Sequence, residues 1–455
     1  MSADLGVIGL GSMAENLVFQ LSQKGLRTAL YNRTTEKLKE FISKNKDLEV
    51  IPCYDIDFFL NSITTPRRIL LLVKAGQPVD DMINSLIPKL NKGDIIIDGG
   101  NSHFKDTEKR YALLESRGIR FLGAGISGGI EGARKGLSIM AGGNVEAYNL
   151  SSKIFDLISS YFDSKPSHSY FGKGGSGHFV KTIHNGIEYA IIENISEIYF
   201  LLKAMGKSNE EIAEIFIKWN EGILASFLLN ACQEILRMKE NDSYLVDLIL
   251  DKAEQKGTGI WASEISLEIG IPAPSISAAV YSRSISSFKN RRIKLSSLLN
   301  LKIKNSIELE ENSIKSALIL ANLMAYLQGF DILRNAEFYG YNFDLKEVMR
   351  VWLGGSIIRS ELLRQLYEAK IDEDLLSSKF VLNMIEENIF DFTKVLSTMI
   401  KNGLPSLVLS SAFNYIVYYF SKNLPANLTQ ALRDYFGAHG FERIDKEGRF
   451  HLRTR

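Results

Sequence analysis

The chain has 455 residues, of which 45% are hydrophobic and 24% charged, and its formal net charge at pH 7 is +1. This length exceeds what one hydrophobic core usually organises, so we expect two or three domains. The composition excludes a mainly disordered chain, and the near-zero net charge gives no global reason to bind nucleic acid or an anionic membrane.

The two cysteines, Cys53 and Cys232, lie far apart and form neither a disulfide framework nor a metal-ligand spacing. We therefore expect structural thiols, no metal site and a cytoplasmic protein. The N-terminus lacks the charged start and long apolar run of a signal peptide. No stretch approaches the about 18 consecutive apolar residues that span a bilayer, so we expect no membrane association.

Residues 1–176 are expected to form a dinucleotide-binding domain. Their short apolar runs alternate with helix-length segments and occur at residues 5–8, 28–31, 68–73, 94–98 and 120–123. Fully apolar strands that alternate with helices are typical of a parallel sheet covered on both faces. The pattern predicts an α/β Rossmann-type doubly wound domain.

A glycine-rich turn joins the first predicted strand to the first predicted helix. Gly9, Gly11 and Ala14 give the pattern G-x-G-x-x-A, which permits a tight turn, close approach of a pyrophosphate and close helix packing. Since a strand and a helix flank the motif, we expect dinucleotide binding rather than a structural turn. The expected cofactor contacts in this turn are Gly9, Leu10, Gly11, Ser12, Met13 and Ala14.

The end of the second predicted strand carries Asn32, Arg33 and Thr34, where an NAD-preferring site places Asp or Glu. A guanidinium between two hydrogen-bonding side chains suits a 2′-phosphate, so we expect NADP as the cofactor. The alternative is that Arg33 is only a solvated loop cation. A later strand ends at the same edge of the sheet with further expected cofactor contacts, Val73, Lys74 and Ala75.

Residues 177–434 are expected to form a large all-α domain, because strand signals nearly vanish there. Helix-length periodic segments occur at 177–205, 209–219, 221–239, 243–253, 313–335, 345–351 and 405–422. Residues 435–455 have no clear period and predict a C-terminal tail that must dock on something to be ordered.

The first helix of this domain carries a polar stripe. Lys181, His184, Asn185 and Glu188 stand at i, i+3, i+4 and i+7, so a helix places them on one face. A polar stripe on so apolar a helix must face water, a neighbouring subunit or a ligand. The plain alternative is a salt-bridged surface.

Polar and glycine residues also follow two of the predicted strands. Asn101 follows one strand, and Ser127, Gly128 and Gly129 follow the next. Ligands bind at the carboxyl ends of strands in open α/β sheets, and glycine-rich backbone there offers N–H groups to a carboxylate. The alternative is a pair of tight turns with no ligand. Their occurrence twice in one domain favours a ligand site that includes the polar helix face.

Six segments, in this order, are long and family-restricted: LLLVKAGQPVDDMI, GDIIIDGGNS, GISGGIEGARKG, GKGGSGHFVKTIHNGIEY, QKGTG and RDYFGAHGFER. The chain resembles the 6-phosphogluconate dehydrogenases in these segments, from about residue 5 to residue 451. The resemblance implies oxidative decarboxylation of 6-phospho-D-gluconate to D-ribulose 5-phosphate and CO2 with NADP, a step of the oxidative pentose phosphate pathway. It also implies that the all-α domain binds the substrate and dimerises.

The resemblance implies a role for each end of the polar stripe. Lys181 is the base that takes the hydroxyl proton and, once protonated, stabilises the enolate oxygen. Glu188 is the acid that protonates the enediol carbon. Free lysine has a pKa near ~10.4, so a working base needs burial or a nearby cation to lower its pKa.

The resemblance also implies the substrate contacts. The positions that hold the carboxylate and hydroxyls are Asn101, Ser127, Gly128, Gly129, His184 and Asn185, and Asn101 also contacts the cofactor. The positions that hold the phosphate and its surroundings are Tyr189, Lys256, Thr258, Arg283, Arg433 and His439. The glycines around Lys256 and Thr258 fit an anion cradle, although Lys256 and Arg283 alone would be solvated charges. Arg433 and His439 imply a homodimer whose tail reaches the partner's active site.

Two other functions remain open. One is a different β-hydroxyacid dehydrogenase with an unphosphorylated substrate, and the other is a catalytically silent NADP-binding scaffold. The chain also departs from the family pattern at Ala14, Ile130 and Ile260, and its short tail puts the extent of subunit interlock in doubt. The basic run at 289–294 is expected to be a solvated face rather than a nucleic-acid site.

Overall fold

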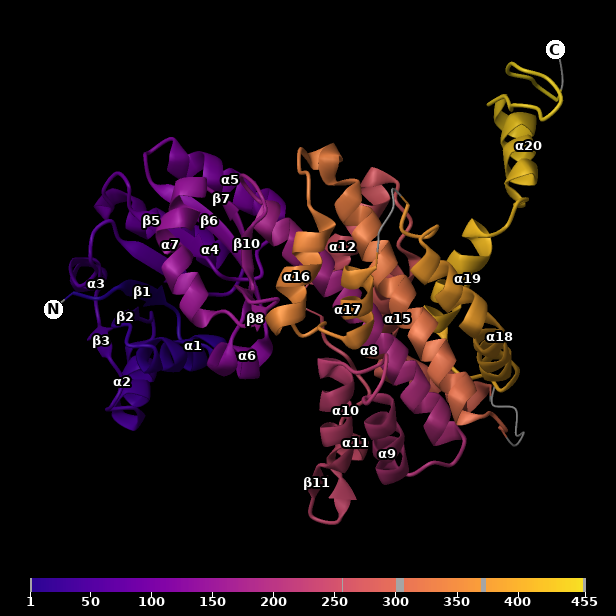
Figure 1. Ribbon diagram of the computed structural model, residues 1–455, viewed down its shortest axis with the longest axis horizontal. Helices are drawn as coiled ribbons and strands as arrows, with labels where there is room; N and C mark the ends of the chain where they lie inside the picture. The colour runs from indigo at the N-terminus through magenta and orange to yellow at the C-terminus, as the bar shows by residue number, and fades with distance from the viewer. Residues whose placement is uncertain (1, 256, 300–306, 370–373, 453–455) are drawn as a thin grey trace.

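The computed structural model describes residues 2–255, 257–299, 307–369 and 374–452. A sheet covered by helices forms the N-terminal part, a helical body follows, and a C-terminal arm, residues 426–452, extends away from that body (Figure 1).

The N-terminal part contains an eight-stranded sheet. Its strands are β1 (Leu5–Ile8), β2 (Thr28–Tyr31), β3 (Val50–Cys53), β4 (Arg68–Leu71), β5 (Ile95–Asp98), β6 (Arg120–Ser127), β7 (Ser138–Gly143) and β10 (His168–Tyr170). They lie in the order β10-β7-β6-β5-β4-β1-β2-β3. Neighbouring strands are parallel except β6 and β7. The order β3-β2-β1-β4-β5-β6 is that of a doubly wound nucleotide-binding sheet, which confirms the predicted fold class.

Helices cover both faces of this sheet. They are α1 (Ser12–Gln23), α2 (Thr35–Lys44), α3 (Ile56–Asn61), α4 (Gln77–Leu86), α5 (Phe104–Glu115), α6 (Gly129–Lys135), α7 (Val145–Ile158) and the 3-10 turn η1 (Ile87–Lys89). One apolar cluster packs α1, α2, α6 and α7 on one face, and a second packs α3, α4 and α5 on the other. Every residue of β1 and β5 is therefore buried, which explains their continuous apolar sequences.

Each strand expected from the sequence is present, but three strands lacked a signal. β3 is only half-buried, and β10 is a short edge strand. β7 carries the sequence SIMAGG and runs antiparallel to β6. Its glycines weaken the apolar pattern, and Gly142 permits close contact with the start of the helix Ser176–Ala204, since an added Cβ would lie 2.3 Å from the Gly177 nitrogen.

The rest of the chain is mainly helical. Its helices are α8 (Ser176–Ala204), α9 (Asn209–Trp219), α10 (Phe227–Arg237), α11 (Leu245–Leu248), α12 (Thr258–Ile269), α13 (Pro274–Ser287), α14 (Lys289–Leu298), α15 (Glu311–Arg334), α16 (Leu345–Gly355), α17 (Glu361–Glu368), α18 (Lys379–Lys401), α19 (Leu407–Tyr419), α20 (Ala426–Gly437) and the 3-10 turn η2 (Ala336–Tyr339). Two small antiparallel pairs join β8 (Tyr161–Phe162) with β9 (Lys165–Pro166) and β11 (Lys239–Glu240) with β12 (Ser243–Tyr244).

The long helix α8 lies at the centre of the molecule. It contacts β6 and β7 on one side and α12, α13 and α15 on the other. By length and composition, helix α15 could span a membrane, although its sequence contains no uninterrupted apolar run of that length. However, 89% of its most apolar 18-residue stretch is buried inside the protein. This burial is that of a core helix.

The helical predictions were right for the longest elements and wrong for several shorter ones. The segment 221–239 forms a helix only over α10, and 243–253 contains only β12 and the four-residue α11. Helices α12, α13, α14, α17, α18 and α20 were not predicted. In α12 the buried face consists largely of small or polar residues such as Ala262 and Ser263, so no apolar stripe marks it.

The C-terminal arm is folded locally around one buried carboxylate. Asp434 accepts hydrogen bonds from the backbone nitrogens of Gly440 and Leu452, each at 2.7 Å, and its Oδ1 lies 2.7 Å from Nδ1 of His451. The predicted boundary between residues 434 and 435 therefore falls inside α20. The outer surface of α20 exposes several large apolar side chains, namely Leu428, Leu432, Tyr435 and Phe436.

Candidate active site

The turn between β1 and α1 presents a helix N-terminus at the carboxyl edge of the sheet. Gly9 adopts φ +104°, and a Cβ added there would lie 2.5 Å from the carbonyl oxygen of Leu72. Gly11 precedes α1 without a side-chain cap, and nothing lies within 4 Å of a Cβ added to it. The uncapped N–H groups and the open space at Gly11 fit a pyrophosphate. The other predicted residues of this turn are Leu10 and Ala14, which are buried, Ser12, which is exposed, and Met13, which is half-buried.

Polar residues at the end of β2 lie at the same edge. Asn32 Nδ2 donates to the Thr34 carbonyl oxygen at 2.9 Å and so shapes the loop before α2. The guanidinium of Arg33 is exposed, and no hydrogen bond or ion pair within the described part of the chain holds it. Its charge is therefore free to pair with a phosphate. The loop after β4 places Lys74 in solvent, with Val73 and Ala75 half-buried beside it.

A cleft of ≈ 310 Å³ lies between the carboxyl edge of the sheet and α8. It brings together many residues that the sequence placed in the substrate and cofactor sites: Met13, Asn101, Ser127, Gly128, Gly129, Lys181, Asn185, Glu188, Tyr189, Thr258 and Arg283. The cleft is also lined by Ile126, Glu254 and Ile357, which the sequence did not single out. Glu254 directly precedes the QKGTG segment, and this position could have indicated a site residue. Nothing in the sequence around the two isoleucines indicates that they line a site.

Lys181 is buried against β6. A Cβ added to Gly125 would lie 2.3 Å from the Lys181 Cβ, so only glycine in β6 lets α8 approach this closely. Lys181 is 5% exposed, and its Nζ lies 3.3 Å from Nδ1 of His184. Burial lowers the pKa of Lys181 to about 8, and the nearby carboxylate of Glu188 opposes this shift. A substantial fraction of Lys181 is therefore neutral near physiological pH.

His184 connects the strand end to the helix face. Its Nε2 lies 3.0 Å from Oγ of Ser127, and its Nδ1 lies 3.2 Å from Oδ1 of Asn185. Ser127 Oγ also accepts from the backbone nitrogen of Ile357 at 3.2 Å. The imidazole is fully buried, and burial, together with the charge of Lys181, holds its pKa well below the usual value. His184 is therefore neutral and acts as a hydrogen-bonding group.

Glu188 lies one turn further along α8. Its Oε2 is 3.8 Å from Nδ1 of His184, and its side chain is 18% exposed. Burial raises the pKa of Glu188, whereas the charges of Lys181 and Arg283 oppose that rise. The same cleft thus holds a lysine with a lowered pKa and a carboxyl group with a raised pKa, as acid–base chemistry near neutral pH requires.

A positively charged group lies at the far end of the cleft. The guanidinium carbon of Arg283 lies 3.4 Å from the centre of the Tyr189 ring, which holds the cation beside the phenol. Thr258 begins α12, and its N-cap Gly257 has φ +96° and no side-chain cap. An uncapped helix start, a hydroxyl and an arginine together suit a phosphate.

Of the remaining residues predicted near the substrate phosphate, two do not line this cleft. Lys256 lies outside the described residues. Arg433 and His439 lie on the C-terminal arm, which extends away from the helical body (Figure 1), and neither lines the cleft. Both are exposed, and Arg433 Nη1 donates only to Gln430 at 3.1 Å among the contacts recorded in the described residues. Within a single chain the arm therefore does not contribute to the site.

Comparisons with known proteins match both parts of the chain. The model of the NAD binding domain of 6-phosphogluconate dehydrogenase matches residues 4–170, and that of the 6-phosphogluconate dehydrogenase C-terminal domain matches residues 177–454. The NADP(+)-dependent, decarboxylating 6-phosphogluconate dehydrogenase of Bacillus subtilis is 44% identical, with 98% of each chain covered. The decarboxylating enzyme of Escherichia coli is 41% identical over the same shares.

A solved structure of the same family matches the whole chain. Plasmodium falciparum 6-phosphogluconate dehydrogenase, studied with NADP+ and with 6-phosphogluconate, superposes with a TM-score of 0.92 at 37% identity and covers 99% of both chains. A 3-hydroxyisobutyrate dehydrogenase of Salmonella typhimurium, at 15% identity and a TM-score of 0.50, covers only 64% of this chain and shares the fold alone. The resemblance found in the sequence is thus confirmed, and the chain belongs to the 6-phosphogluconate dehydrogenase family.

Proposed function

We propose that this chain is an NADP-dependent enzyme that oxidises and decarboxylates 6-phosphogluconate to ribulose 5-phosphate and CO2. The observation that carries the proposal is the pairing of Lys181 and Glu188 in one cleft, with the pKa of the lysine lowered to about 8 and the pKa of the carboxyl group raised. Full-length similarity to enzymes named for this activity supports the same conclusion.

Lys181 is proposed as the base in the oxidation. Its neutral amine takes the proton of the substrate hydroxyl on the carbon β to the carboxylate, while bound NADP supplies the acceptor for the hydride from that carbon. The resulting β-keto acid has a carbonyl oxygen beside protonated Lys181. That ammonium stabilises the negative charge that develops on the oxygen as CO2 leaves.

Glu188 is proposed as the acid that follows decarboxylation. The enediol left by CO2 needs a proton on carbon, and a carboxyl group with a raised pKa retains its proton at higher pH than a free glutamic acid. Neutral His184, tied to Ser127 and Asn185, orients the substrate by hydrogen bonds rather than by charge. We propose that Asn101, Gly128 and Gly129 also bind the carboxylate and hydroxyls of the substrate.

The phosphate of the substrate is proposed to bind at the far end of the cleft. Tyr189, Thr258 and Arg283 line that end, and Lys256 and a partner's Arg433 and His439 are proposed to complete it. NADP rather than NAD is supported by Arg33, which is exposed and has no ion pair within the described residues, and by the absence of an acidic side chain among residues 32–34.

A homodimer is proposed because the C-terminal arm has no role within its own chain. The arm projects from the body (Figure 1). It exposes several large apolar side chains on α20, and Arg433 is also exposed. Such an arm can pack its exposed apolar side chains against a second copy of the chain. We also propose three units, 1–176, 177–434 and 435–455, and a cytoplasmic location.

The direct test is a spectrophotometric assay of the purified protein with 6-phosphogluconate and either NADP or NAD. NADPH absorbance and an equal amount of CO2 are expected, with a higher kcat/KM for NADP. Gluconate is the control substrate and is expected to react poorly, because it lacks the phosphate that Arg283 and Thr258 engage. Equal rates with gluconate would favour a different β-hydroxyacid substrate, and no turnover would reject the enzyme.

A further inference from the structure

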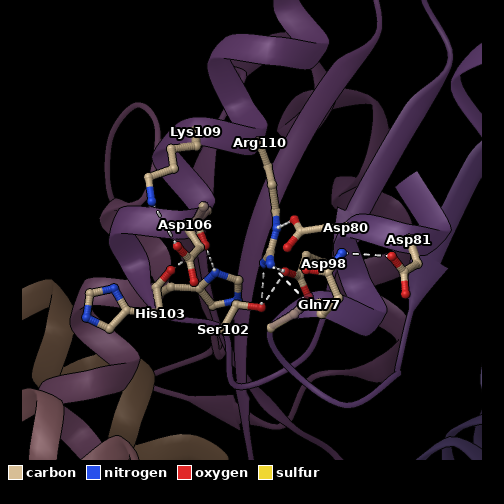
Figure 2. Close-up of polar contacts among 12 residues, drawn as sticks. Gln77, Asp80, Asp81, Asp98, Ser102, His103, Asp106, Lys109 and Arg110 are labelled. Carbon is tan, nitrogen blue, oxygen red and sulfur yellow. Dashed lines mark hydrogen bonds and ion pairs between the residues drawn. The ribbon is translucent and has the colours of Figure 1, made fainter. Parts of the chain in front are cut away.

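A buried arginine lies behind the wall of the cleft, on α5. Arg110 is 3% exposed, and its guanidinium contacts four acceptors from two stretches of the chain, 76–80 and 98–102 (Figure 2). Nε donates to Asp80 at 2.7 Å, and Nη1 donates to Asp98 at 3.2 Å and to Ser102 at 3.0 Å. Nη2 donates to the carbonyl oxygen of Gly76 at 3.2 Å. Arg110 is therefore a junction between elements, not a surface ion pair.

The acceptors belong to the two loops that carry predicted ligand contacts. Gly76 and Asp80 lie at the end of the β4–α4 loop and on α4, directly after the cofactor segment 73–75. Asp98 ends β5, and the loop after it carries Asn101 and then Ser102. Asn101 itself is exposed and lines the cleft, whereas its neighbours Gly100 and Ser102 donate hydrogen bonds to the buried Asp98.

Asp98 organises the second loop around this arginine. Its side chain is fully buried, its Oδ1 accepts from the backbone nitrogen of Gly100 at 3.0 Å, and its Oδ2 accepts from the Ser102 hydroxyl at 2.6 Å. The Ser102 oxygen in turn accepts from Arg110. The carboxylate thus fixes the residues on both sides of Asn101, and Arg110 fixes the carboxylate.

We infer that Arg110 is a positioning residue that sets the spacing between the cofactor loop at 73–76 and the Asn101 loop. This inference rests on the proposed function, because it takes segment 73–75 and Asn101 as the contacts to NADP and substrate. Arg110 touches neither ligand. It acts through Asp98 and Gly76, and both loops shift relative to each other when its planar fork is lost.

Only arginine provides this geometry. Its guanidinium presents five N–H donors in a rigid plane, whereas lysine has one ammonium on a flexible stem. Arg110→Lys keeps a positive charge for the buried Asp98 but cannot reach all four acceptors. Arg110→Ala is unsuitable as a test, since it leaves the buried Asp98 carboxylate without a counter-charge and destabilises the fold.

The chain offers a matched control at the opposite edge of the same strands. Arg67 and Asp94 form a second buried ion pair, in which Arg67 Nη1 donates to Asp94 at 2.8 Å and Arg67 Nε donates to the Leu60 carbonyl oxygen at 2.8 Å. This pair lies at the start of β4 and β5, away from the cleft. Arg67→Lys therefore damages an equivalent buried pair without moving the ligand loops.

The experiment compares Arg110→Lys with Arg67→Lys in the full-length protein. Thermal unfolding measures stability, calorimetric titration with NADP measures cofactor affinity, and steady-state rates give kcat and KM. Both variants should lose stability. Only Arg110→Lys should raise the Kd for NADP, by about 10-fold, and lower kcat/KM for 6-phosphogluconate by about 100-fold, because small displacements of positioning groups have effects of this size.

A second variant keeps the inference testable if Arg110→Lys does not fold. Ser102→Ala removes the hydroxyl between Asp98 and Arg110 but leaves their ion pair, so a smaller change in the same direction is expected. Wild-type NADP affinity in the Arg110 and Ser102 variants, or equal losses in Arg67→Lys, would overturn the inference. Failure of the wild-type protein to oxidise 6-phosphogluconate would instead reject the proposed function, and the NADP titrations would still decide the role of Arg110.

Discussion

Lys181 and Glu188 share one face of α8, but the structure around that face sets their ionisation. Burial lowers the pKa of Lys181 to about 8 and raises the pKa of Glu188, while each charge partly offsets the shift of the other. The close approach of α8 to Gly125 is what excludes water from Lys181. A base with a lowered pKa and an acid with a raised pKa therefore result from packing rather than from residue type alone.

Glu188→Gln is expected to move the acidic limb of the kcat/KM profile to lower pH. Lys181 must be neutral to accept a proton, so kcat/KM should rise with pH up to about 8 and fall about tenfold per pH unit below that. In the proposed mechanism Glu188 acts after CO2 has left, so its own titration does not enter kcat/KM. Its carboxylate raises the pKa of Lys181, and removing that charge lowers this pKa.

Initial rates of NADPH formation across the pH range give the profile. Glu193→Gln makes the same charge change on the same helix, where Glu193 Oε1 instead accepts from Ser282 at 2.5 Å, and it should leave the limb in place. A limb that stays at the wild-type pH in Glu188→Gln would show that another group is the base.

At the scale of elements, the two glycines of the β1–α1 turn are required for different reasons, although they look alike in the sequence. Gly9 is required by the fold, because its φ is +104° and the carbonyl of Leu72 occupies the space of a side chain. Gly11 has an ordinary φ of −95° and open space around it. The second glycine is therefore needed for the ligand and not for the chain.

Gly11→Ala is expected to leave thermal stability unchanged but to weaken NADP binding by at least about tenfold, because the methyl group enters the space of the pyrophosphate. Gly9→Ala is expected to lower the free energy of unfolding by about 1–3 kcal/mol through backbone strain, before any effect of the clash. Thermal unfolding of the ligand-free variants and titration with NADP separate the two effects. A destabilised Gly11→Ala, or normal NADP affinity in it, would contradict this division.

At the scale of the whole molecule, the C-terminal arm leaves the cleft incomplete within one chain. The cleft ends at Arg283 and Thr258, whereas Arg433 projects into solvent on an arm that is ordered by its own Asp434 (Figure 1). A phosphate dianion is held best by several cations and donors. We therefore propose that a second copy of the chain supplies Arg433 to this site.

Subunit complementation tests this arrangement. Lys181→Arg removes the base and Arg433→Ala removes the arm's cation, so each homodimer should be nearly inactive at low substrate concentration. If the arm serves the partner's site, a heterodimer of the two variants contains one site with both defects and one intact site. Refolding equal amounts together should then restore about one quarter of wild-type activity, since half of the dimers are mixed.

The mixture is compared with the two variants refolded separately, and dimer formation is followed by light scattering. Activity no higher than the mean of the separate variants would indicate that the arm serves its own chain's site.

The sequence by itself determined the local features of this protein. The spacing of Lys181, His184, Asn185 and Glu188 defines one helix face, the G-x-G-x-x-A turn defines a nucleotide site, and continuous apolar runs define buried parallel strands. These features depend on residues close together in the chain, so helical and strand periodicity reveal them. The resemblance to a known family extended them to the phosphate-binding residues.

Only the tertiary structure decided which other residues these local features contact. It placed β7 antiparallel beside β6, buried Lys181 against Gly125, added Glu254 and Ile357 to the cleft, and set Arg110 beneath both ligand loops. Apart from Glu254, which precedes the QKGTG segment, the residues in these contacts carry no local pattern, because each contact joins different elements of the fold. Burial, pKa and loop spacing depend on such contacts, and they therefore appear only once the chain is packed.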